Sequence, residues 1–118
     1  MVFESGVKLE KEISDEICSF LAKQDIFFWR EEMGKTNDGR RRKYALRKNT
    51  FRGMPDILCL IDGTLVCFEI KSPYNRKGLR PEQKLVREKI MANGGKYFLV
   101  RTVEEVKRTV QPYFLTLF

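Results

Sequence analysis

The first part of the chain carries hydrophobic residues at helical spacing. From about residue 8 to residue 24, an apolar stripe that includes Ile13, Ile17 and Leu21 recurs every three or four positions, which predicts an amphipathic helix. The aromatic run at residues 26–30 predicts a strand, and we interpret its Phe and Trp side chains as core residues in preference to stacking platforms for bases. A polar loop at 31–39 and a second strand at about 41–49 follow.

Two apolar runs in the middle of the chain flank an Asp-Gly dipeptide at positions 62–63. This arrangement is a strong signal for a hairpin with a two-residue turn. The turn pairs residues 56–61 with residues 65–71, sets Ile61 opposite Thr64, and sets Asp56 opposite Glu69. Both faces of the hairpin are apolar, so we expect layers on both sides of the sheet, as in α/β proteins.

Helix and strand patterns alternate in the last third of the chain. Pro81 suits the first position of a helix that ends at the Asn-Gly-Gly sequence of residues 93–95. Residues 96–101 predict a core strand, and residues 103–113 predict a closing helix with Val106 and Val110 facing inward. The whole pattern predicts one α/β domain over residues 1–118.

The chain has a net charge of +7, and one segment holds seven basic residues and no acidic one. Such clustering indicates a polyanionic partner, most simply nucleic acid, although basic side chains also protect a solvated loop or edge strand from aggregation. Three further basic residues lie in the first strand and in the loop after the hairpin. The candidate nucleic-acid-binding residues are Arg30, Arg40, Arg41, Arg42, Lys43, Arg47, Lys48, Arg52, Arg76 and Lys77.

Composition excludes several classes of protein. The chain has no histidine, which excludes histidine-based triads and His₃ zinc sites, and its three cysteines lack the CxxC spacing of a zinc site. No apolar run reaches the length of a membrane span, and the first residues do not resemble a signal peptide, so we expect a cytoplasmic protein.

The open end of the hairpin carries the candidate chemistry. Opposed side chains have Cβ atoms about 4.5–5.5 Å apart, so Asp56 and Glu69 repel each other, and Lys71 lies on the same face. A hard cation such as Mg²⁺ would explain two converging carboxylates, because it takes oxygen ligands. The alternative is a cross-strand charge cluster at a solvated sheet end.

Two helices add further candidates. Glu10 continues the apolar stripe of the first helix towards the sheet, whereas Glu12 lies on the more polar side, and either acid could instead complement the helix dipole. Gln83 shares a face with Val86 and Ile90, so its amide points towards the hairpin, where a structural role and an active-site role are both open.

These residues resemble the PD-(D/E)XK signature of metal-dependent nucleases, with Pro55-Asp56 followed by Glu69-Ile70-Lys71. Within that superfamily the chain is similar to the stand-alone VRR-NUC domains that are common in phages. The resemblance covers most of the chain, and its ordered matches are Glu10-Lys11-Glu12-Ile13, Phe28-Trp29-Arg30, Gly34, Gly53-Met54-Pro55-Asp56, Glu69-Ile70-Lys71-Ser72-Pro73, Leu79-Arg80-Pro81-Glu82-Gln83 and Gly94-Gly95.

The resemblance implies an αβββαβ core with a mixed central sheet flanked by helices. It also implies that Asp56, Glu69 and the main-chain carbonyl of Ile70 hold Mg²⁺ or Mn²⁺, with Glu10 helping. Lys71 would orient or deprotonate the attacking water, and a glutamine such as Gln83 extends the family signature.

The implied function is a structure-selective DNA endonuclease, similar to Holliday junction resolvases, that acts as a homodimer on branched DNA, in a bacterial host cell if a phage encodes it. The alternatives are a flap or general duplex endonuclease, a restriction enzyme, which usually needs more chain, and a non-catalytic DNA-binding module that kept the fold. A basic RNA-binding domain is a further option, but no RRM, KH or dsRBD pattern is present.

Overall fold

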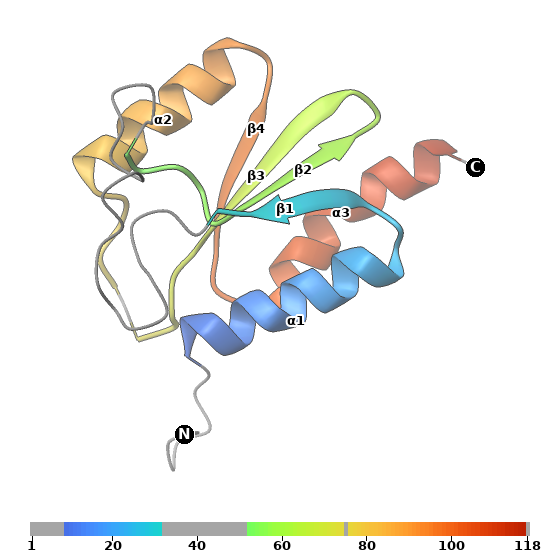
Figure 1. Cartoon of the computed structure of the whole chain (residues 1–118), viewed down its shortest axis with the longest axis horizontal. Coiled ribbons are helices and arrows are strands. Elements are labelled where there is room, and N and C mark those ends of the chain that lie inside the picture. Colours follow the sequence, from blue (N-terminus) through green and yellow to red (C-terminus); the bar gives the residue numbers. More distant parts are fainter. Residues whose placement is uncertain (1–8, 32–51, 75, 118) are drawn as a thin grey trace.

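The computed structural model describes residues 9–31, 52–74 and 76–117, with the side chains described up to residue 113. The predicted strand at 41–49 and the basic residues at 40–48 lie outside the described residues. In chain order the described elements are α1 (Glu10–Lys23), β1 (Phe27–Arg30), β2 (Ile57–Ile61), β3 (Thr64–Ile70), α2 (Pro81–Ala92), β4 (Lys96–Val100) and α3 (Val103–Leu117). Their order confirms the predicted αβββαβ core, which α3 follows (Figure 1).

The four described strands form one mixed sheet in the order β1-β2-β3-β4. The β2–β3 hairpin has the predicted register, with Ile61 opposite Thr64 and Ile57 opposite Phe68. Asp62 and Gly63 both have positive φ, at 50° and 78°, as a tight hairpin turn requires. β4 lies parallel to β3, and α2 provides the crossover between them.

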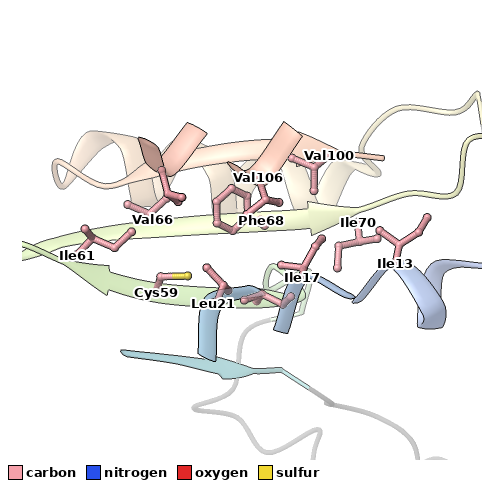
Figure 2. Close-up of a cluster of buried hydrophobic side chains, with 12 residues drawn as sticks. Ile13, Ile17, Leu21, Cys59, Ile61, Val66, Phe68, Ile70, Val100 and Val106 are labelled. Atoms are coloured by element: carbon pink, nitrogen blue, oxygen red, sulfur yellow. The ribbon is translucent and has the colours of Figure 1, made fainter. Parts of the chain in front are cut away.

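Helices cover both faces of the sheet, as the apolar pattern predicts. α1 and α3 lie on one face, and α2 lies on the other beside β4 (Figure 1). The main core fills the space between the sheet and the α1–α3 layer, where Ile17 and Val106 are fully buried (Figure 2). The side chains of this core are Ile13, Ile17, Leu21, Ile57, Cys59, Ile61, Val66, Phe68, Ile70, Val100, Val106 and Val110.

The aromatic strand β1 differs from the prediction. Phe28 packs against the core, but Phe27 is 66% exposed and Trp29 is 38% exposed. Alternate residues of a strand point to opposite faces, so Phe27 and Trp29 project to the face opposite α1, where Phe27 pairs with Leu60, itself 44% exposed. On that face α2 packs against β4, at the far edge of the sheet from β1. The interpretation of the whole aromatic run as core is therefore wrong for two of its side chains.

Among the described residues, no helix has the length and apolar character needed to cross a membrane. The three cysteines are all free thiols.

Candidate active site

The open end of the β2–β3 hairpin brings two carboxyl groups together. Asp56 directly precedes β2, and its Oδ2 accepts a hydrogen bond of 2.7 Å from the main-chain N–H of Ile70. Its own carbonyl accepts a 2.8 Å bond from the N–H of Glu31, which extends the pairing beyond β1. Glu69, in β3, is only 4% exposed. The two acids therefore sit at the point where the interior of the sheet ends.

Burial and mutual repulsion favour the protonated form of this pair. Burial, followed by the charge of Asp56, raises the pKa of Glu69 to about 8, although the Lys71 ammonium opposes the rise. Burial also raises the pKa of Asp56, against the hydrogen bond from Ile70. Glu69 Oε1 is buried, and no donor from the described part of the chain reaches it. An acidic oxygen in this state is open to a proton or a cation.

Lys71 and Gln83 converge on the other oxygen of Glu69. Lys71 Nζ lies 3.8 Å from Glu69 Oε2, and Gln83 Nε2 donates a 2.9 Å hydrogen bond to the same atom. Gln83 Oε1 accepts a 2.8 Å bond from the N–H of Arg80, the residue that precedes α2. The amide of Gln83, which is 2% exposed, therefore both caps α2 and holds Glu69.

The two candidate acids of α1 have different partners. Glu12 Oε1 accepts a 3.3 Å bond from the N–H of Leu9, which caps the start of the helix. Glu10 Oε2 instead accepts a 3.2 Å bond from the N–H of Ser72, just beyond β3. Glu10 also lines a cavity of about 180 Å³ together with Asp56 and Ile70. Its position relative to the sheet agrees with the phase expected from the apolar stripe.

The carboxyl oxygens at this site could fill only part of the coordination shell of a hard cation. Among residues 9–31, 52–74 and 76–117, no group of three or more His, Cys, Asp or Glu side chains is spaced to hold a metal ion. Two carboxyl groups converge, however, and one buried oxygen of Glu69 lacks a donor. Mg²⁺ commonly keeps several waters and needs only one or two carboxylates from a protein. The residues present therefore fit a sparsely held divalent cation.

Only four of the ten candidate nucleic-acid-binding residues lie in the described part of the chain. Arg30 extends from the end of β1 to α1, where its Nη1 lies 3.1 Å from Asp15 Oδ1. Arg52, Arg76 and Lys77 are exposed. The other six candidates, at positions 40–48, lie outside the described residues.

Two residues beside the site, Arg101 and Ser72, were not assigned a role from the sequence. Arg101 Nη1 donates a 2.8 Å hydrogen bond to the carbonyl of Ser72, whose N–H binds Glu10. Ser72 falls within the matched run after Lys71, but nothing in the local pattern indicates that a side chain following the last strand reaches it.

Comparisons with known proteins agree with this architecture. No family model matches the chain, and no curated protein matches it. Among solved structures, a chain described as "VRR_NUC domain" is similar, with a TM-score of 0.59 at 18% identity. The match covers 86% of this chain and 94% of that chain. The predicted resemblance is thereby confirmed in three dimensions: this chain has the fold of a VRR_NUC domain.

Proposed function

We propose that this chain is a nuclease that uses a divalent metal ion to hydrolyse phosphodiester bonds in DNA. The observation that carries the proposal is the convergence of Asp56, Glu69, Lys71 and Gln83 at the open end of a hairpin that is otherwise interior. The likeness to the VRR_NUC domain supports it, because that name denotes a nuclease fold. The pKa of Glu69, raised by burial and by the neighbouring Asp56, also supports it, because such shifts cluster at functional sites.

In this proposal, the metal-binding residues are Asp56, Glu69 and the main-chain carbonyl of Ile70, with Glu10 contributing from α1. A bound Mg²⁺ or Mn²⁺ would neutralise charge at the scissile phosphate and would lower the pKa of water. Lys71 orients or deprotonates the attacking water, and its positive charge offsets the charge that develops on the phosphate. Gln83 fixes the rotamer of Glu69 through the 2.9 Å bond to Oε2. The resemblance to metal-dependent nucleases implies that the products would carry a 5′-phosphate and a 3′-hydroxyl.

We propose branched DNA as the substrate and a homodimer as the active form. The net charge of +7 supports a DNA partner. Contacts from lysine and arginine to phosphates position a duplex without reading its sequence, so recognition would rest on DNA shape. Paired cuts at a four-way junction require two sites, which a dimer of this small domain provides. The reaction would take place in the cytoplasm, that of a bacterial host if a phage encodes the protein.

The first test is cleavage of end-labelled four-way junction, flap and linear duplex DNA with Mg²⁺, Mn²⁺ or EDTA. We expect metal-dependent, symmetric nicking of the junction by the wild type and its loss in Asp56→Asn. Asp62→Asn is the matched control, because it makes the same chemical change in the exposed hairpin turn. Glu10→Gln and Glu12→Gln form a second pair, of which only Glu10→Gln should abolish cleavage, since glutamine can still cap α1 at position 12.

Other outcomes of the cleavage test would indicate a different function. Equal cutting of all three DNAs would make it a general endonuclease, and preferred cutting of flaps would make it a flap endonuclease. An active monomer on junction DNA would rule out the dimer. Tight DNA binding without cleavage under any metal would favour a non-catalytic binding module and would refute the proposed activity.

A further inference from the structure

The peptide that follows Lys71 is held from two sides. The N–H of Ser72 donates to Glu10 Oε2 at 3.2 Å, and the carbonyl of Ser72 accepts from Arg101 Nη1 at 2.8 Å. The N–H of Lys71 donates to the carbonyl of Val100 at 3.0 Å, one step beyond the last β3–β4 pair. Main-chain and side-chain groups at the end of β4 therefore both contact this turn.

Arg101 lies at the junction between β4 and α3, which several hydrogen bonds stabilise. Its own N–H donates to Glu105 Oε1 at 2.7 Å, and the N–H of Thr102 donates to the same oxygen at 3.1 Å. In return, the N–H of Glu105 donates to Thr102 Oγ1 at 3.2 Å, which completes a capping box at the start of α3. Because the backbone of Arg101 is fixed in this way, its planar guanidinium reaches Ser72 from a rigid support.

We propose that Arg101 is a positioning residue for the candidate site, an inference that rests on the proposed nuclease function. By binding the carbonyl of Ser72, Arg101 fixes the turn that contains Lys71 and the N–H of Ser72, which bonds Glu10. The ammonium of Lys71 then stays beside Glu69, at 3.8 Å from Oε2, and the N–H of Ser72 stays bonded to Glu10 of α1. Loss of the bond from Arg101 would free the main chain after Lys71 from the β4–α3 junction. The ammonium of Lys71 would then be less precisely placed, and a small displacement is enough to slow catalysis.

A cation near a DNA-cutting site could also contact a phosphate directly. A phosphate contact changes DNA affinity and its dependence on salt, whereas a positioning residue changes the rate of the bound complex. The two roles are therefore separable by measuring binding and single-turnover cleavage independently.

The test compares Arg101→Met, which keeps an unbranched apolar side chain but no donors, with Arg101→Lys, which keeps the charge and one donor nitrogen. Arg108→Met, on the exposed face of α3, is the matched control for loss of one arginine. For Arg101→Met we expect a fall of about tenfold or more in the single-turnover rate. DNA affinity in EDTA and its salt dependence should be unchanged, and Arg101→Lys should recover part of the rate. Arg108→Met should match the wild type.

Amide hydrogen exchange at Ser72 in the metal-free protein provides a readout that does not require cleavage. We expect faster exchange in Arg101→Met and no change in Arg108→Met. An unchanged cleavage rate in Arg101→Met, or a loss confined to DNA affinity and salt dependence, would overturn the inference. If the wild type cuts no DNA, the proposed function fails by itself, and unchanged exchange at Ser72 would then overturn the role of Arg101 as well.

Discussion

At the scale of single residues, Glu69 links the chemistry of the site to the stability of the fold. Its carboxyl group is buried, faces Asp56, and binds Gln83 through one oxygen only. A carboxyl group in such a place is easier to keep neutral than charged. The folded chain therefore holds a proton here at pH values where the unfolded chain has released it.

This difference predicts how stability depends on pH. The pKa of Glu69 rises from an ordinary value of 4.5 to about 8 on folding, so the folded state binds more protons between these values. The free energy of unfolding should accordingly fall as pH increases from about 4.5 to about 8. Urea unfolding across this range, with and without Mg²⁺, measures the slope.

Glu69→Gln should flatten this pH dependence, while Asp62→Asn should leave it in place. Saturating Mg²⁺ should stabilise the wild type more at pH 8 than at pH 6, because binding requires the deprotonated form. A contribution of Glu69 that increased stability with rising pH would contradict the account of the acid pair.

At the scale of elements, the contact between Gly53 and α2 positions Gln83. Gly53 has φ of +82°, and a Cβ at this position would lie 2.7 Å from the main-chain carbonyl of Glu82 and 2.9 Å from the nitrogen of Gln83. The absence of a side chain lets the approach to β2 pass directly against the first turn of α2. The same contact therefore lies directly beside the backbone of Gln83, whose side chain bonds Glu69.

Gly53→Ala and Gly63→Ala form a matched pair. Gly63 has φ of +78°, but a Cβ there would meet nothing within 4 Å, so its substitution carries only the backbone strain of roughly 1–2 kcal/mol. Gly53→Ala adds a clash with the backbone of α2 and should lose about 1–3 kcal/mol more. Urea unfolding measures both losses, and cleavage per folded molecule should fall only in Gly53→Ala. Equal losses in the two variants would show that α2 shifts without resistance.

The elements also show how far the sequence can predict the site. Asp56 and Glu69 were predictable as a pair, because a two-residue turn allows one register and residue numbers then follow by counting. Glu10 was predictable in direction, because helical periodicity relates it to the buried stripe of α1.

Other features depend on how elements dock, which no local pattern contains. The bond from Arg101 to Ser72 joins residues 29 positions apart in the sequence. It depends on the α2 crossover, which places β4 beside β3. The exposure of Phe27 and Trp29 has a similar origin. Strand alternation separates them from Phe28, but only the placement of α2 over β4 decides which face stays uncovered.

At the scale of the whole molecule, positive charge should govern DNA affinity. The basic residues at positions 40–43 lie outside the described residues, so this prediction depends on charge alone. Replacing all four with glutamine should weaken binding at low salt. It should also reduce the slope of log K against log salt by up to about 0.9 for each lost duplex contact.

The cleavage rate of the saturated complex should not change in this variant, because these residues bind and do not react. A control replaces two basic residues elsewhere, Lys23 and Arg108, which are exposed on α1 and α3, and should leave the salt slope as it is. An unchanged slope after replacement of residues 40–43 would place the DNA elsewhere on the molecule.

The exposed aromatic side chains of β1 affect how any of these variants should be followed. Phe27, Trp29 and Leu60 present apolar surface in the folded state, so a dye that fluoresces on apolar surface should bind the native protein and not only partly folded states. Trp29 is the single tryptophan and is already partly in water, so its emission should shift little on unfolding. Its fluorescence reports on the open face of β1, whereas loss of the core should be followed by circular dichroism.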